Sequence, residues 1–94
     1  MNTNALNQIL TERGTRYGKF AQHAEVAQRL KRVIAAELAK RNKILADDQL
    51  EAIDMICHKI ARIINGDPDY ADSWTDIAGY AQLVATRLET GETL

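Results

Sequence analysis

Residues 48–65 constrain this chain most, because a helix over them would be apolar around most of its circumference. Apolar residues recur every three or four positions and form a stripe along the helix, and neighbouring apolar residues make this stripe wider. The apolar residues are Leu50, Ile53, Met55, Ile56, Cys57, Ile60, Ile63 and Ile64. A helix of this kind needs packing partners on more than one side. The segment therefore predicts a central helix in an all-α protein, ended by Gly66 and kept from continuing by Pro68.

Three further segments show helical periodicity. They are a short helix from about Asn4 to Arg13, a long amphipathic helix from Phe20 to about Arg41, and a helix from Asp72 or Ser73 to about Glu89. Gly14 is placed to end the first, so residues 14–19 are expected to form a loop. The 94 residues thus predict one domain over residues 1–94, a bundle of about four helices with a frayed tail at about 90–94.

The charge balance argues against a polyanionic partner. Twelve basic and thirteen acidic residues give a net charge of −1, so no long-range field would steer the chain onto DNA, RNA or an anionic membrane. No stretch approaches the roughly 18 consecutive apolar residues of a membrane span, and the polar start of the chain does not resemble a signal peptide. The expected location is the cytoplasm, without membrane association and with nucleic acid disfavoured as a partner.

The apolar content of so small a chain predicts self-association. Hydrophobic residues make up 46% of the sequence and aromatic residues only 5%, so the core must be built from aliphatic side chains. A chain of this length buries only about 60–65% of its unfolded surface. Apolar stripes that stay exposed are expected to find a partner subunit, which predicts a homo-oligomer. The single cysteine, Cys57, lies in an apolar run and is expected to be buried and inert.

Two pairs of acidic residues can each present two carboxylates from one helix face. They are Glu51 with Asp54 and Asp72 with Asp76. Hard oxygen ligands of this kind suit Mg²⁺ bound to a phosphate-bearing substrate. Antiparallel helices would nevertheless hold Glu51 and Asp72 about 20 Å apart. Structural roles are equally available: a capping box of Asp48 with Glu51, a solvated face for Asp54, an N-cap at Asp72, and a favourable helix-dipole position for Asp76.

Cationic and aromatic residues gather in two places. Lys59 and Arg62 are placed to meet Asp72 or Asp76 across the hairpin, either as an ion-pair network or as the lining of a phosphate pocket. The Arg16-Tyr17-Gly18-Lys19 segment offers donors, an aromatic face and exposed backbone, as a nucleotide-contacting loop would, or forms a turn anchored by Tyr17.

Two other features point less clearly to chemistry. His23 and His58 have no partner at metal-ligand spacing, so neither predicts a zinc site. Gly79 lies inside a predicted helix, where it costs about 1 kcal/mol relative to alanine, and suggests that another group approaches the backbone closely.

Three separated motifs carry a resemblance to a known family. Their order is Arg16-Tyr17-Gly18, then Lys59-Ile60-Ala61-Arg62, then Asp72-x3-Asp76-Ile77-Ala78-Gly79-Tyr80. This order resembles a family of short phage and prophage proteins, which is in turn similar to the MazG-like all-α nucleoside triphosphate pyrophosphohydrolases. The resemblance implies a MazG-like helical bundle in the host cytoplasm that binds a nucleotide. It also implies Mg²⁺ held by acidic pairs, for which Glu51-x-x-Asp54 and Asp72-x3-Asp76 are the counterparts here.

The leading interpretation is a protein that binds a nucleotide or nucleotide-derived signal, with Mg²⁺-dependent hydrolysis left open and no catalytic residue assigned. The candidate binding residues are Arg16, Tyr17, Lys19, Lys59, Arg62 and Tyr80, and the candidate metal ligands are Glu51, Asp54, Asp72 and Asp76. The alternative is a non-enzymatic phage inhibitor of a bacterial defence complex, which would act through protein–protein contacts.

Overall fold

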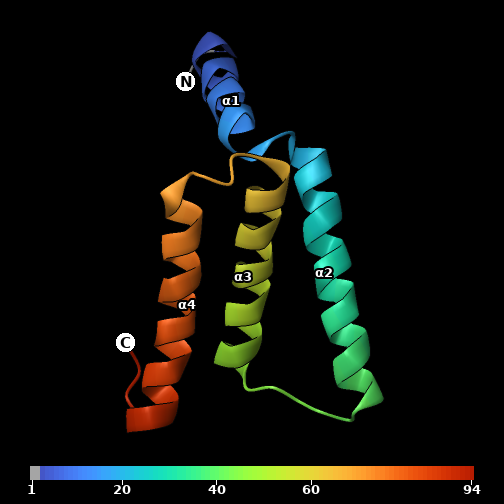
Figure 1. The fold of residues 1–94 in the computed structure, drawn as a ribbon, viewed down its shortest axis with the longest axis vertical. Coiled ribbons are helices and arrows are strands. Elements are labelled where there is room, and N and C mark those ends of the chain that lie inside the picture. The colour runs from blue at the N-terminus through green and yellow to red at the C-terminus, as the bar shows by residue number, and fades with distance from the viewer. Residues whose placement is uncertain (1–2) are drawn as a thin grey trace.

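The computed structural model describes residues 3–94 and contains four helices and no strand over that range (Figure 1). The helices are α1 (Thr3–Tyr17), α2 (Phe20–Lys40), α3 (Asp47–Asn65) and α4 (Ala71–Thr90). The predicted all-α class and the four helices are confirmed, while residues 1 and 2 of the predicted domain lie outside the described part. None of the described helices combines the length and apolarity that crossing a membrane would require.

Helices α2, α3 and α4 stand side by side in one layer, with α3 in the middle (Figure 1). Within residues 3–94, α3 contacts both α2 and α4, whereas α2 and α4 do not contact each other. Helix α1 extends beyond one end of this layer and touches α2 and α3 there. The radius of gyration is 15.9 Å, against about 12 Å for a compact domain of this length. The helices therefore form a small bundle that is open, with three of its helices in a single layer.

The first helix runs further than predicted. Gly14 lies inside α1, and the helix ends instead at Tyr17, before Gly18. Gly18 has the left-handed φ of 79°, and its N–H donates to the carbonyl of Gly14 at 2.9 Å. A helix ends where the backbone turns left-handed, and glycine adopts that conformation without steric cost. The expected loop over residues 14–19 is thus reduced to residues 18–19.

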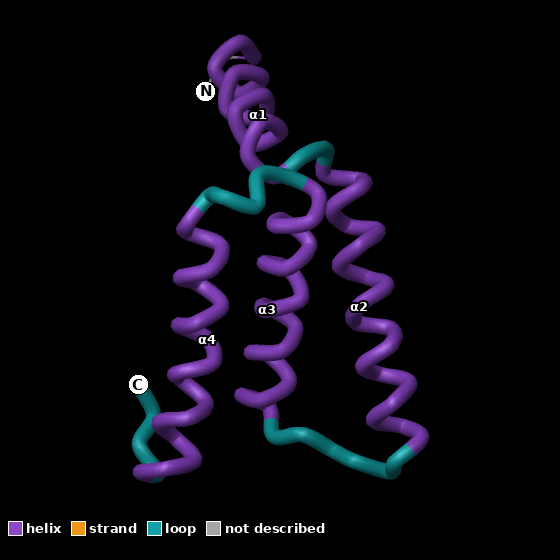
Figure 2. The backbone as a smooth tube through the Cα atoms, in the orientation of Figure 1, coloured by secondary structure: helices purple, strands orange, loops and turns teal. Residues whose placement is uncertain are grey.

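The two loops at this end of the layer interlock (Figure 2). The side-chain amide of Asn65 donates to the carbonyls of Tyr17 at 2.9 Å and Lys19 at 3.1 Å. Gly66 closes α3 as predicted, and a Cβ at that position would overlap the carbonyl oxygen of Arg16. The N–H of Asp67 donates to the same carbonyl at 2.6 Å. These bonds attach the α1–α2 turn to the α3–α4 turn.

The predicted caps of α3 and α4 are wrong. At the start of α3 the N–H of Ala46 donates to the Gln49 side chain at 2.9 Å, so Gln49 takes the role predicted for Glu51. Asp48 instead binds Arg87 of α4, with an Nη2–Oδ1 distance of 2.8 Å. Helix α4 begins after Tyr70, which places Asp72 in its first turn and not at its N-cap. A tertiary ion pair has displaced the local cap at Asp48.

The apolar part of the buried core contains only small side chains. Its apolar members are Ala27, Ala52, Cys57 and Ala61, and no large side chain among residues 3–94 is fully buried. Cys57 is 3% exposed, which confirms its predicted burial, and burial raises the pKa of its thiol. Many of the larger apolar residues of the helices remain exposed to solvent.

Gly79 has open space around it, contrary to the close approach predicted there. A Cβ built on Gly79 meets no other heavy atom within 4 Å. We therefore expect Gly79→Ala to stabilise the protein by about 1 kcal/mol, which corresponds to a rise in melting temperature of about 4–8 °C.

Gly66→Ala should lower the melting temperature, because the added Cβ overlaps the Arg16 carbonyl. Thermal unfolding followed by circular dichroism tests both; a destabilised Gly79→Ala would mean that an additional group packs there.

Candidate functional site

A cavity of about 400 Å³ opens where α1, the α1–α2 turn, α2 and α3 meet. Its lining residues are Leu10, Arg13, Gly14, Tyr17, Gly18, Lys19, Phe20, His23, His58 and Arg62. This lining includes three permanent cations and no carboxylate. It also includes Tyr17 and three further aromatic or imidazole side chains. The cavity is therefore suited to an anionic ligand with a planar group.

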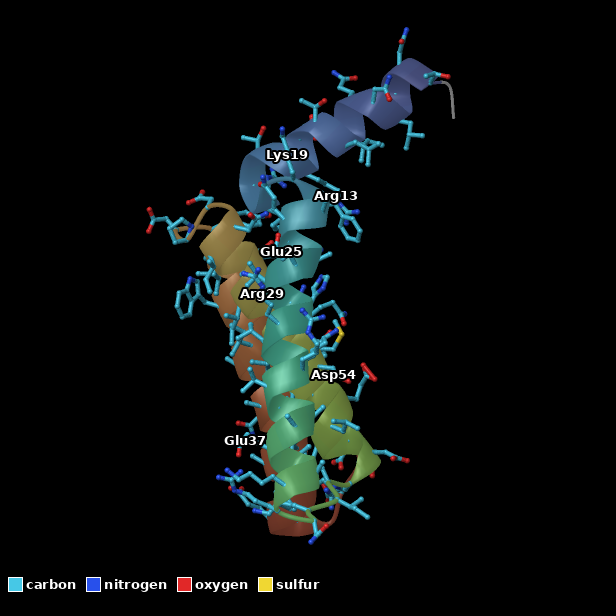
Figure 3. The ribbon with its side chains drawn as sticks, turned by 90° about the vertical axis from the view of Figure 1, so that its right-hand side faces the viewer. Arg13, Lys19, Glu25, Arg29, Glu37 and Asp54 are labelled. Atoms are coloured by element: carbon cyan, nitrogen blue, oxygen red, sulfur yellow. The ribbon has the colours of Figure 1, made fainter. Side chains whose placement is uncertain are left out.

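The cations reach the cavity from three different elements. Arg13 lies on α1, Lys19 on the turn and Arg62 on α3. The Arg62 guanidinium lies 4.1 Å from the centroid of the Tyr17 ring, a cation–π contact that holds both side chains in place. Figure 3 shows Arg13 and Lys19 near the junction of α1 with α2.

Phe20 and His23 form the aromatic part of the lining. Their ring centroids are 6.0 Å apart with an interplanar angle of 28°, so the rings are stacked. Phe20 is 78% exposed although it begins α2 and lines the cavity. An exposed phenyl ring at the mouth of a cationic cavity offers a stacking surface to an aromatic ligand.

A pair of histidines closes the inner part of the cavity. His23 Nε2 lies 3.2 Å from His58 Nδ1, and the two rings meet edge to face at 4.5 Å between centroids. His23 is 5% exposed, and its Nδ1 has no hydrogen-bond partner within residues 3–94. Burial lowers the pKa of both histidines, and the charge of Arg62 lowers both pKa values further. The pKa of His58 is lowered to about 4. Both rings are therefore neutral at pH 7, and one ring donates its N–H to the other.

No local sequence pattern predicts this pair, because 35 residues separate its members. Only the position of His23 carried a signal. It lies three residues after Phe20 and four before Ala27, on the stripe that the helical period predicted to face inward. A polar ring on that stripe needs a partner from another helix.

Three of the six predicted binding residues line this cavity, namely Tyr17, Lys19 and Arg62. Arg16 lies just outside it on the other side of the turn. Its guanidinium carbon is 5.1 Å from the Tyr70 ring centroid, and its Nη1 donates to the Tyr70 hydroxyl at 3.4 Å. Arg16 thus helps to join α1 to the start of α4.

The other two, Lys59 and Tyr80, lie elsewhere. The Lys59 side chain is directed at α4, where its Nζ is 2.9 Å from Asp76 Oδ2, so the ion pair across the hairpin forms for Lys59, whereas Arg62 lies over Tyr17 instead. Lys59 is only 9% exposed. Tyr80 lines a second cavity of about 380 Å³ between α3 and α4, together with Asp48 and Arg87. The predicted set therefore divides between one shared site and two positions in the α3–α4 interface.

The four candidate metal ligands do not converge within one chain. Because Asp48 pairs with Arg87 and Lys59 with Asp76, Glu51 lies beside the C-terminal half of α4. Asp72 lies at the opposite end of α4, beside the Tyr70 hydroxyl, and raises the pKa of that tyrosine. Among the described residues, no three His, Cys, Asp or Glu side chains are grouped as metal ligands. Mg²⁺ binding stays a prediction of the sequence.

Comparison with known families places the chain in one of them. Residues 2–88 match the profile of a family described as Domain of unknown function (DUF6378). The chain belongs to this family. No curated protein and no solved structure matches it. For this DUF6378 protein, the cavity between α1, α2 and α3 is therefore the main structural evidence for a function.

The Lys59–Asp76 pair allows a direct test of its structural role. We expect Asp76→Asn to destabilise the protein by about 1–3 kcal/mol, because it leaves the buried Lys59 ammonium without its counter-ion. Lys59→Met combined with Asp76→Asn should recover much of that loss, since the stranded charge is removed while the aliphatic stem is kept. Urea unfolding of the single and double variants measures this. Equal losses in both would show that the charge of Lys59 does not matter.

The histidine pair predicts a pH dependence of stability. In the unfolded chain histidine titrates near pH 6.5, whereas the folded-state pKa is lowered for both, to about 4 for His58. The unfolded state therefore binds more protons between these values, so stability falls as pH decreases from about 6.5 to 4. We expect a loss of about 1–2 kcal/mol, since His58 is only partly buried. Urea unfolding at several pH values should show a weaker dependence in His58→Asn; an unchanged dependence would assign it to the carboxylates.

Proposed function

We propose that this protein binds a nucleotide or a nucleotide-derived signal in the cavity between α1, α2 and α3. The observation that carries the proposal is the composition of the lining: three cations and several aromatic rings without a carboxylate. Phosphate groups are bound by arginine and lysine donors, and purine or pyrimidine bases by stacking on aromatic rings. A volume of about 400 Å³ is in the range of small-molecule sites.

The lining suggests how the ligand would be oriented. Arg13 and Lys19 are exposed and can turn toward a phosphate, whereas Arg62 is held against Tyr17. The exposed face of Phe20 is available for a base. The phosphate would therefore bind near the α1–α2 turn and the base on the α2 side of the cavity.

The similarity of the sequence motifs to a phage-protein family, and of that family to MazG-like enzymes, supports a nucleotide as the ligand. The proposal is limited to binding. The carboxylate that an enzyme would need beside the phosphate is absent from the lining, and Asp76 is already paired with Lys59. Hydrolysis with Mg²⁺ would need acidic groups brought from outside this cavity.

A second candidate function is inhibition of a host defence complex through protein–protein contacts. The observation that favours it is the number of large apolar side chains exposed on all four helices. The two functions are separated by whether small nucleotides alone stabilise the protein.

Nucleotide binding is tested by a thermal-shift screen with mononucleotides, dinucleotides and cyclic nucleotides, with and without Mg²⁺. A ligand at 100 times its dissociation constant should stabilise the protein by about 2.7 kcal/mol. We expect Arg13→Ala and Lys19→Ala each to weaken binding about 5- to 20-fold through loss of a charge-assisted contact. Calorimetric titration of the best ligand measures the dissociation constants.

Arg29→Ala is the matched control for these variants. Arg29 is an exposed cation of α2 that pairs with Glu25 at 2.6 Å and is not part of the cavity lining. Its loss should leave the dissociation constant unchanged. Equal weakening by all three substitutions would indicate a general charge effect, and no stabilisation by any nucleotide would contradict the proposal.

A further inference from the structure

Helix α3 has two chemically different open sides. Lys59 points at α4, as its ion pair with Asp76 shows. Counting about 100° per residue from Lys59 places every isoleucine of α3 on one side of this direction, and these are Ile53, Ile56, Ile60, Ile63 and Ile64. The same count places Glu51, Asp54, His58 and Arg62 on the other side. No charged residue of α3 falls on the isoleucine side.

Helix α4 continues the apolar side of α3. Counted from Asp76, which points at α3, Ile77, Val84 and Leu88 fall on one side of the helix. Since α3 and α4 are antiparallel and face each other, this is the side of the layer on which the isoleucines of α3 lie. Leu88 is 59% exposed, so the described chain leaves most of it uncovered.

Helix α2 continues the same surface on the other flank. Val33 of α2 is 63% exposed. Glu37 is one turn beyond Val33, and Figure 3 shows it projecting from the side of the layer opposite Asp54.

All three helices therefore share one face, here called the isoleucine face, which is aliphatic on α3 and α4 and carries Val33 beside Glu37 on α2. Its central and exposed members are Val33, Ile56, Ile60, Ile64, Ile77 and Leu88. Ile56, Ile60 and Ile77 are partly exposed, and Ile64 is 64% exposed. An exposed aliphatic surface of this extent marks an interaction site, and in a two-layer domain such a surface faces the second layer.

We propose that the isoleucine face is the interface of a homodimer, in which the same face of a second copy supplies the missing layer. The buried apolar side chains of one chain are all small, so the chain needs its partner whenever it is folded. A second copy is present at the concentration of the chain itself. In a two-fold dimer the face meets itself, and the absence of charge on its α3 part avoids like-charge repulsion there.

The size of the face fits a stable dimer. Three helices of about 20 residues are each about 30 Å long, and at about 9–10 Å between axes they cover a width of about 28 Å. The face therefore measures about 800 Å² per chain, the area that each partner contributes to a standard protein interface. The nucleotide cavity involves His58 and Arg62 on the opposite side, so the dimer does not rest on the proposed function.

The test begins with the unaltered chain. Sedimentation equilibrium from 1 to 100 µM should give twice the chain mass of 10.5 kDa. The midpoint of urea unfolding should rise with protein concentration, because folding and association are coupled. A monomer at 100 µM, with an unfolding midpoint independent of concentration, overturns the proposal without any substitution.

Substitutions then locate the interface. Val33→Glu and Ile64→Glu should each raise the dimer dissociation constant at least 100-fold, or unfold the chain at concentrations where the unaltered protein is folded. Ile44→Glu is the matched control, because Ile44 is 96% exposed in the α2–α3 loop, outside the face. It should leave the dimer unchanged. A dimer that survives both substitutions on the face, or is disrupted equally by Ile44→Glu, places the interface elsewhere and overturns the assignment.

Discussion

Helix α3 is the only described helix that touches all three others, and the structure depends on how its circumference is divided. One edge is fixed to α4 by Lys59 with Asp76 and by Asp48 with Arg87, which set the register of the two helices at both ends of their contact. The other edge meets α2 through the histidine pair. With both edges occupied, the remaining two sides of α3 stay open, one polar and one made of isoleucine. The cavity and the isoleucine face are consequences of this division.

Much of the fold could be predicted from local patterns. The start of α2 at Phe20 and the end of α3 at Gly66 follow from helical periodicity and glycine placement. The predictions of helix ends and caps are wrong where the same residue type is compatible with two local structures. Gly14 continues a helix and Gly18 ends one, and only the left-handed φ of Gly18 distinguishes them. Asp48 suits a helix cap, but Arg87, 39 residues later, takes its carboxylate instead.

The candidate site was predictable only in part, for the same reason. Tyr17, Lys19 and Arg62 were identified by their types and motifs, and they do share a cavity. His23 and His58 were considered separately, because no local pattern shows that α2 and α3 bring them to 3.2 Å. The sequence position of Lys59 suits a phosphate ligand as well as an ion pair, and its burial against Asp76 gives it a structural role. The roles of His23, His58 and Lys59 depend on contacts between helices, and local sequence patterns do not predict these contacts.

The absence of contact between α2 and α4 in the described chain bears on how the protein folds. Apart from the end of α1, each helix packs only on its neighbours in sequence, so the contact order is low and few long loops must close before contacts form. Stability is then close to a sum of nearest-neighbour terms, as in short repeat proteins. During synthesis, α1, α2 and α3 can dock before α4 has left the ribosome, and α4 can detach while the other helices keep their contacts with one another.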